Sequence, residues 1–305
     1  MSNPATSFEP YRRRLLGLAY RMLGSVADAE DAVQETYLRW HGADRDKVSD
    51  PRAFLMTVAT RICLDMLTSA RARREQYVGP WLPEPVLDTA ALAPDSRTEL
   101  AEDLSIALLL ILDQLSLERA AFLLHDVFDF SFSEVATAME RSETACRQLA
   151  TRARAHVRAV RPRGAAAPLR SGEIDAKHGE LLSAFVAATQ AGDLNRLTQL
   201  LASDVRVVTD GGGKVPAALN VIDGADRVAQ FLVSVTRKGW REDFTLRFAT
   251  INGLSGVIVN GPEGPVQTAA FEIEGDVIRA LYVVRNPDKL RHLAAASTPH
   301  EDGPA

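Results

Sequence analysis

The chain has 305 residues, of which 46% are hydrophobic and 25% charged, and its net charge at pH 7 is −5. These are ordinary values for globular protein, and they exclude a wholly disordered chain. The length predicts two or three domains. The negative net charge excludes a uniformly basic protein that coats nucleic acid, although it is compatible with a local basic surface.

The sequence gives no sign of export or of a membrane anchor. Its two cysteines, Cys63 and Cys146, are too few for a disulfide framework, which predicts a reducing compartment. Residues 1–10 contain no apolar stretch like that of a signal peptide. The longest aliphatic run, residues 106–112, is far shorter than the roughly 20 residues of a membrane span. We therefore expect a cytoplasmic protein.

Two breaks divide the chain into three blocks. The first break, residues 78–97, has prolines at positions 80, 83, 85 and 94, a density incompatible with a helix or a central strand. The second, residues 164–173, is a linker of Pro, Gly and Ala. We predict domains over residues 1–77, 98–163 and 174–293, and a disordered tail over residues 294–305.

The first block is predicted to be helical, because apolar residues recur at helical spacing from Phe8 onward. Within it, residues 28–40 form an amphipathic helix that Ser25 caps and whose first turn is acidic, which suits the helix dipole. Asp50 caps the next helix and Pro51 opens it. An ordinary helical bundle contains such helices too, so periodicity alone assigns this block no function.

The second block is predicted to end in a helix-turn-helix. A short helix, which begins at Ser131 with Glu134 three residues later, precedes a tight turn at residues 140–142 and a longer helix capped by Ser142. Residues 141–163 contain seven arginines and one acid, Glu143. This basic helix fits the major groove of duplex DNA. The alternative is a helical hairpin with a solvated arginine face.

Two groups of side chains on that longer helix are candidate DNA contacts. Those near its start would approach base edges, and those further along would meet phosphates. The base-edge candidates are Arg141, Glu143, Thr144, Arg147 and Gln148, and the phosphate candidates are Arg152, Arg154 and Arg158.

The third block changes from helix to strand. Residues 174–201 and 225–236 are predicted to be helical, and several strand-like stretches joined by glycine-rich turns indicate an α+β domain. Some of its side chains are candidates for catalysis, although no spacing pairs an acid with a base. They are Asp210, Asp223, Asp243, Tyr282 and His292.

The GGGK stretch at residues 211–214 invites comparison with a phosphate-binding loop. The comparison fails, because Val208 replaces the first glycine of that motif and Val215 replaces its Mg²⁺-binding hydroxyl residue. We expect no cofactor. The six histidines are scattered without metal-ligand spacing, so we expect no metal site either.

Three segments together resemble bacterial sigma factors of the extracytoplasmic-function (ECF) group. They are DAEDAVQETYLRW at residues 28–40, DPRAFLMTVATRICLDML at residues 50–67 and FSEVATAMERSETACRQLATRARAHVR at residues 132–158. The resemblance covers residues 8–160. WLPEP at residues 81–85, DGGGK at 210–214 and NPDKL at 286–290 resemble the subgroup with a fused SnoaL-like, polyketide-cyclase-like domain.

The resemblance implies two all-α helical sigma domains, the second with the helix-turn-helix, and a cone-shaped α+β SnoaL-like domain at the C-terminus. It implies a protein that directs RNA polymerase to promoters, initiates transcription and is not itself an enzyme. Residues 1–77 would bind the β′ clamp of the polymerase core and the −10 element, and residues 98–163 would bind the −35 element. The C-terminal domain would regulate activity in cis.

The resemblance also implies roles for individual residues. The polymerase contacts would be Asp31, Gln34, Glu35 and Arg39, and the DNA contacts of the first domain Arg52, Arg61, Arg71, Arg73 and Arg74. Regulatory contacts between the C-terminal domain and the linker or sigma domains would involve Trp81, Leu82, Pro83, Asp210, Gly211, Gly212, Gly213, Lys214, Asn286, Pro287, Asp288 and Lys289. Trp81 is expected to pack against the third block, since leaving it exposed forgoes about 2 kcal/mol of burial.

Two other classes of function stay open at this point. One is a helix-turn-helix regulator that binds DNA independently of polymerase. The other is a SnoaL-like enzyme or small-molecule sensor in the C-terminal domain. The enzyme alternative predicts a carboxylate inside a large apolar pocket.

Overall fold

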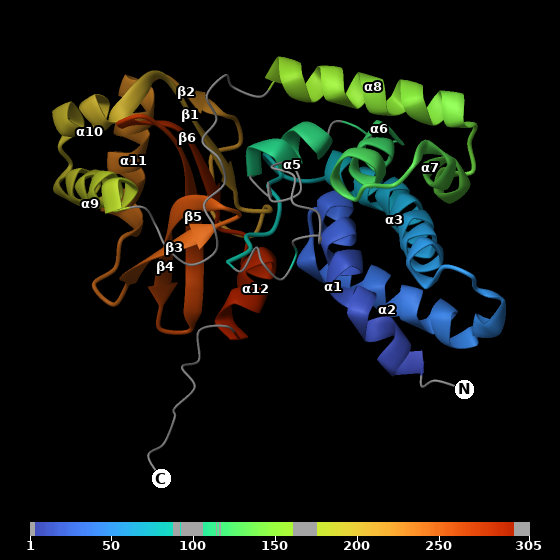
Figure 1. The fold of residues 1–305 in the computed structure, drawn as a ribbon. Helices are drawn as coiled ribbons and strands as arrows, with labels where there is room; N and C mark the ends of the chain where they lie inside the picture. The colour runs from blue at the N-terminus through green and yellow to red at the C-terminus, as the bar shows by residue number, and fades with distance from the viewer. Residues whose placement is uncertain are drawn as a thin grey trace, which may run out of the picture. The chain divides into compact units, whose positions relative to one another are not determined.

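The computed structural model describes residues 4–87, 92, 106–113, 115, 117–160 and 176–295. The chain divides into two compact units, Met1–Gln76 with Asp88–Arg163 and Tyr77–Leu87 with Gly164–Ala305. The blue-to-green helices of Figure 1 belong to the first unit, and the yellow-to-red elements to the second. The predicted linker at residues 164–173 and the predicted tail beyond residue 295 lie outside the described residues.

The first unit begins with three helices, α1 (Pro4–Leu23), α2 (Val26–Gly42) and α3 (Pro51–Glu75), which pack against one another. The Ser25 hydroxyl accepts a hydrogen bond from the Asp28 amide at 3.1 Å and begins α2. Asp50 Oδ1 accepts one from the Ala53 amide at 3.1 Å and begins α3. Both predicted caps are confirmed. The buried faces include Leu15, Leu18, Met22, Val33, Trp40 and Leu55.

The rest of the first unit is also helical in its described part. It comprises α5 (Ile106–Asp113), α6 (Leu117–Phe122), a π-helical turn (Leu123–Val127), α7 (Phe132–Met139) and α8 (Glu143–Val160). α5 contacts α1, and both α6 and α7 contact α3. The two predicted helical blocks therefore share one compact unit.

Buried arginines join these two helical blocks. Arg119 of α6 is 1% exposed and donates to the carbonyl of Met22 at 2.5 Å and to that of Leu109 at 3.1 Å. Asp113 lies 3.5 Å from the same guanidinium. Burial lowers the pKa of Arg119 to about 9. Arg14 of α1 donates to the carbonyl of Phe128 at 2.5 Å, so both arginines bind backbone oxygens across the junction.

The second unit is an α+β domain. Its helices are α9 (Ala176–Ala191), α10 (Leu194–Leu200), α11 (Ala225–Gly239) and α12 (Pro287–Ala295). Its strands are β1 (Leu201–Asp210), β2 (Ile222–Asp223), β3 (Thr245–Ile251), β4 (Leu254–Gly261), β5 (Gly264–Glu274) and β6 (Val277–Val284). The sheet order is β2-β1-β6-β5-β4-β3, with β1 parallel to β6 and the other neighbours antiparallel.

The local structure of this unit differs from the sequence prediction at two places. The predicted helix over 174–201 is divided into α9 and α10, because Gly192 adopts a φ of 72° and Asp193 caps α10 through the Arg196 amide at 2.9 Å. NPDKL, for which no helix was predicted, opens α12, and α12 continues two residues past the predicted domain end at residue 293.

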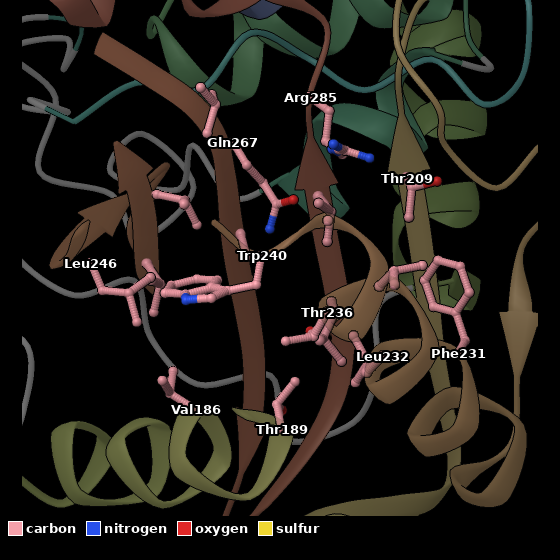
Figure 2. A pocket seen from close by; sticks show the side chains of 18 of the residues that line it. Val186, Thr189, Thr209, Phe231, Leu232, Thr236, Trp240, Leu246, Gln267 and Arg285 are labelled. Atoms are coloured by element: carbon pink, nitrogen blue, oxygen red, sulfur yellow. The ribbon is translucent and has the colours of Figure 1, made fainter. Parts of the chain in front are cut away.

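Helices α9, α10 and α11 cover one face of the sheet (Figure 1). The core between them includes Leu182, Leu197, Val205, Val228 and Leu281. Packing is incomplete there, and a cavity of about 420 Å³ lies between α9, α11 and the sheet (Figure 2).

Candidate nucleic-acid interface and linker-docking site

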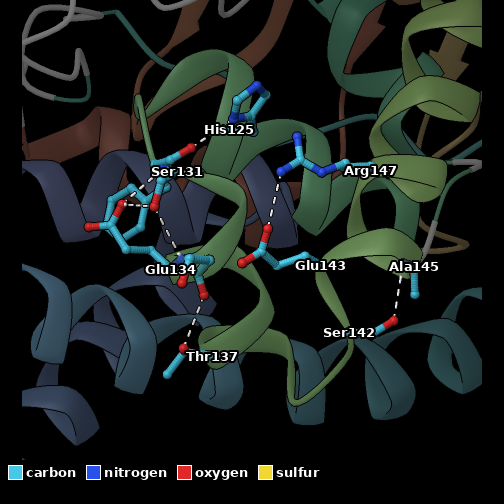
Figure 3. A network of polar contacts seen from close by, with 10 residues as sticks. His125, Ser131, Glu134, Thr137, Ser142, Glu143, Ala145 and Arg147 are labelled. Carbon is cyan, nitrogen blue, oxygen red and sulfur yellow. Dashed lines mark hydrogen bonds and ion pairs between the residues drawn. The ribbon is translucent and has the colours of Figure 1, made fainter.

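The helix-turn-helix is formed by α7, the turn and α8 (Figure 3). The Ser131 hydroxyl accepts from the Glu134 amide at 3.3 Å, and the Glu134 carboxylate accepts from the Ser131 amide at 2.7 Å, which confirms the predicted capping box. Glu140 ends α7 in the left-handed region at a φ of 54°. Ser142 Oγ then accepts from the Ala145 amide at 3.2 Å and begins α8.

Most predicted DNA-binding side chains of α8 lie on one exposed face. The opposite face buries Cys146, Ala150, Ala153 and Val157 against the first unit. The exposed side chains are Arg141, Glu143, Thr144, Arg147, Gln148, Arg152 and Arg158. The arrangement gives a basic, solvent-exposed helix that can enter a DNA groove.

Two of the arginines of α8 have partners within the unit. Arg147 lies 4.5 Å from the centre of the Phe132 ring and 3.1 Å from Glu143, so it is oriented near the start of the helix. Arg154 is half-buried and pairs with Asp126 at 2.7 Å. A phosphate contact by Arg154 must share or replace that ion pair, which distinguishes it from the exposed Arg152.

The predicted polymerase-binding residues lie along the polar face of α2. Asp31, Gln34 and Arg39 are exposed, and Glu35 accepts a hydrogen bond from Arg39 at 3.0 Å. Leu38 is 57% exposed beside them, although sequence periodicity gave no reason to single it out.

The predicted DNA-binding arginines of α3 are engaged inside the first unit. Arg52 donates to the carbonyl of Phe128 at 3.1 Å. Arg61 donates to the carbonyl of Thr137 at 3.0 Å and pairs with Glu140 at 3.2 Å, both at the end of α7. The side chains of Arg71, Arg73 and Arg74 lie outside the described residues.

The segment Tyr77–Leu87, predicted as part of a linker, lies in the second unit. Asp210, at the end of β1 and fully buried, holds it. Asp210 Oδ1 accepts from the Tyr77 hydroxyl at 2.5 Å, and Oδ2 accepts from the Leu82 amide at 2.8 Å. Burial and the bond to Asp210 raise the pKa of Tyr77, so its hydroxyl remains a donor. We call this arrangement the linker-docking site.

Lys289 of α12 provides the opposite charge in the linker-docking site. Its Nζ donates to Asp210 Oδ2 at 2.7 Å and to the carbonyl of Leu82 at 2.5 Å. The same ammonium lies 4.3 Å from the centre of the Trp81 ring, within cation–π range. The prediction that Trp81 packs against the third block is therefore confirmed. Leu82 and Pro83 are buried beside it.

The glycine loop after β1 brings two further motifs into contact with the segment. Gly212 adopts a φ of 60°, and a Cβ there would overlap the Asn286 side chain and lie 2.9 Å from the Tyr77 hydroxyl. Asn286 donates to that hydroxyl at 2.8 Å. Lys214 pairs with Asp288. The structure thus brings together WLPEP, DGGGK and NPDKL, with Gly211 and Gly213 in the same loop and Pro287 opening α12.

The second half of the segment is bound by Asn252, which the sequence did not single out, and by His292, which it offered only as a catalytic candidate. Val86 and Asn252 exchange two hydrogen bonds, at 3.0 Å from the Val86 amide and at 2.7 Å from the Asn252 amide. His292 Nε2 lies 2.7 Å from the carbonyl of Pro85. No local spacing signalled these contacts or the role of Tyr77, because each partner lies more than 130 residues away in the sequence.

The cavity offers no general base for an enzyme. Among the described residues that line it there is no Asp, Glu, His, Cys or Tyr. The five side chains that the sequence offered as catalytic candidates do not line the cavity and make contacts elsewhere. Asp210 and His292 bind the docked segment, Asp223 pairs with Arg206, Asp243 pairs with Arg241, and Tyr282 donates to Glu272.

Within the described part of the chain, no group of three His, Cys, Asp or Glu side chains is placed to hold a metal ion. No helix among these residues is both long enough and apolar enough to span a membrane.

Comparison with known families defines the class of the first unit. Residues 8–73 match Sigma-70 region 2, and residues 105–157 match Sigma-70, region 4. These ranges hold the helical bundle with α2 and the helix-turn-helix respectively. The helical part of the chain is therefore that of a sigma factor.

Relatives extend this class to the whole chain. The chain is 40% identical over 295 residues to the ECF RNA polymerase sigma factor SigJ of Mycobacterium tuberculosis, which covers 93% of this chain and 92% of the relative. It is 30% identical to the probable ECF RNA polymerase sigma factor SigI of that organism, over 95% and 96% of the two chains. The crystal structure of SigJ superposes with a TM-score of 0.70, covering 94% of this chain and 98% of that one.

The chain belongs to the ECF RNA polymerase sigma factors. It directs RNA polymerase to promoters, and its partners are the polymerase core and promoter DNA. It is not an enzyme, since the class contributes recognition and the polymerase carries out RNA synthesis. Its C-terminal unit is an α+β domain with a mixed sheet, and the superposition on the SigJ structure extends over it.

Proposed function

We propose that the C-terminal unit regulates promoter recognition in cis by holding the linker between sigma regions 2 and 4. The observation that carries this proposal is the buried Asp210–Lys289 pair, which binds both backbone groups of one linker residue, the Leu82 amide and the Leu82 carbonyl. Region 2 ends near residue 73 and region 4 begins near residue 105, so Tyr77–Leu87 falls between them.

Docking the segment limits how the two regions can move. The bound residues are withdrawn from the length of chain that joins α3 to α5. Arg52 and Arg61 bind the end of α7 and the preceding turn, and they would have to leave those contacts to reach DNA. The linker-docking site can favour or oppose this rearrangement of Arg52 and Arg61 only if its own contacts differ between the free and the polymerase-bound states.

Further residues are proposed as contacts of this sigma factor with its partners. The exposed face of α2 binds the polymerase core, with Leu38 as an apolar contact. The exposed face of α8 reads the −35 element, while α3 and residues 41–51 hold the melted −10 strand. These events take place in the cytoplasm. The polymerase contacts are Asp31, Gln34, Glu35 and Arg39.

Run-off transcription with purified core polymerase tests the regulatory proposal, on promoter fragments selected with the wild-type protein. The variants are Asp210→Asn and Tyr77→Phe. The matched control is Asp276→Asn, because Asp276 lies in an exposed turn of the same unit, paired with Lys177. Breaking a buried ion pair costs about 3–5 kcal/mol, enough to release the linker in most molecules. We expect Asp210→Asn to change transcript yield at least about tenfold, and the control to leave it unchanged.

The direction of the change shows whether docking restrains or assists the sigma factor. Hydrogen exchange at the Leu82 amide reports release of the linker independently of transcription. Accelerated exchange at Leu82 in Asp210→Asn, together with wild-type transcript yield, would refute regulation through this site.

A further inference from the structure

The cavity of the C-terminal unit has apolar walls and one polar end. Aromatic side chains line it, namely Phe185 of α9, Phe231 of α11, Phe271 of β5 and Trp240, which follows α11. Its volume of about 420 Å³ is within the range of sites that enclose small organic molecules. Figure 2 shows Gln267 and Arg285 at one end and Trp240 and Thr236 nearer the apolar residues Leu246 and Leu232.

The polar end is formed by two adjacent strands. Thr268 pairs with Val284, so the next step of the antiparallel register places Gln267 of β5 opposite Arg285 at the end of β6. Thr209 of β1 lies on the other side of Arg285 (Figure 2). A planar guanidinium and an amide therefore meet at one end of a largely apolar space, beside the Thr209 hydroxyl, which is bonded to the Ala218 backbone.

Arg285 is only partly satisfied by the protein. Its Nη1 donates to the carbonyl of Pro216 at 2.5 Å. Its Nε is buried and has no hydrogen-bond partner among the described residues. No Asp or Glu of the described residues forms an ion pair with it, and burial lowers its pKa. Arg285 as a whole is only partly buried, so a bound anion that pairs with it would offset the partial desolvation of its guanidinium.

We propose that this cavity binds an apolar organic acid, with the carboxylate of the ligand on Arg285 and Gln267 and its hydrophobic body between α9, α11 and the sheet. A guanidinium presents parallel N–H donors that match a carboxylate. The absence of acids among the lining residues disfavours cationic ligands. The cavity walls accept either an acyl chain or a ring system, and the carboxylate is the feature common to both.

Isothermal titration of the full-length protein tests the proposal with two acids and their neutral counterparts. The probes are decanoate with decanamide, and 2-naphthoate with 2-naphthamide, so that the two pairs distinguish a chain from a ring. We expect at least one acid to bind with a stoichiometry of one and about tenfold more tightly than its amide, as a charge-assisted hydrogen bond provides.

Arg285→Gln removes the charge and keeps an amide at the polar end. We expect it to abolish the preference for acid over amide while the amide still binds. The matched control is Arg247→Gln, an exposed arginine on β3. Equal affinity for acid and amide in the wild type, no saturable binding of either acid, or an unchanged preference in Arg285→Gln would each overturn the proposal. The first two outcomes do not depend on any variant folding.

Discussion

Two roles can be considered for Asp210, that of a general base and that of a structural hydrogen-bond acceptor. A buried carboxylate in a SnoaL-like fold suggests a general base. Here both oxygens accept hydrogen bonds, from Tyr77, Leu82 and Lys289, and the side chain is absent from the cavity lining. A carboxylate bonded in this manner is fixed in position, so its contribution is to bind the docked segment.

Gly212 provides a residue-scale prediction with an internal control. Both Gly212 and Gly275 have left-handed backbones, with φ of 60° and 61°. A Cβ on Gly212 would overlap Asn286, whereas a Cβ on Gly275 would meet nothing within 4 Å. Gly275→Ala should therefore cost only the backbone strain, about 1 kcal/mol, and Gly212→Ala at least about 1 kcal/mol more.

Urea unfolding of the two glycine variants measures this difference, and hydrogen exchange at Leu82 shows whether it arises at the linker-docking site. Equal destabilisation by the two substitutions would mean that the close approach of Asn286 to the glycine loop contributes nothing.

At the scale of elements, α8 carries arginines with two different roles. Arg152 is exposed, whereas Arg154 pairs with Asp126 at 2.7 Å. Arg152→Ala should leave the free energy of unfolding within about 0.5 kcal/mol of wild type and lower the salt dependence of promoter binding by about one counterion. Arg154→Ala should lower the free energy of unfolding by about 1 kcal/mol, because Asp126 loses its partner.

Chemical denaturation and promoter binding by the holoenzyme at several salt concentrations test this pair of substitutions. If Arg154→Ala unfolds like the wild type, the ion pair with Asp126 makes no contribution to stability.

Short-range signals explain which elements could be predicted from the sequence. Ser131 and Glu134 are three residues apart, and Ser25 and Asp50 cap helices within one turn, so spacing alone identified these starts. The division at Gly192 and the helix after Asn286 were missed. At Gly192 the signal is local, because a left-handed glycine is followed by Asp193, which caps the next helix, but the apolar periodicity across this region did not reveal it. Pro287 likewise stands at the first position of α12, where proline is favoured.

At the scale of the whole molecule, long-range contacts escaped prediction. Tyr77, Asn252 and His292 bind partners more than 130 residues distant, and no periodicity relates residues so far apart. The three motifs of the linker-docking site were identified through resemblance to a subgroup, but the resemblance gave no hydrogen bond between them. Buried Arg119 was also missed, since a single arginine in a helical pattern predicts an exposed side chain.

Arg119 therefore gives a prediction about the stability of the first unit. Arg119→Ala leaves the Met22 and Leu109 carbonyls and Asp113 without this buried donor. The expected loss in free energy of unfolding is about 3–5 kcal/mol. Arg39→Ala removes an exposed pair with Glu35 in the same unit and should cost less than about 1 kcal/mol. Thermal unfolding of the two variants is the measurement, and similar melting temperatures would contradict it.

The docked segment also determines what happens when the chain is cut. Because Tyr77–Leu87 belongs to the second unit, the polypeptide passes between the units at 76–77, at 87–88 and at 163–164. A protease site inserted within residues 164–173 severs only the third of these crossings. The two fragments should therefore elute together in gel filtration and separate only in denaturant. Conversely, a truncation after Arg163 leaves Leu82, Pro83 and Val86 without the surface that buries them.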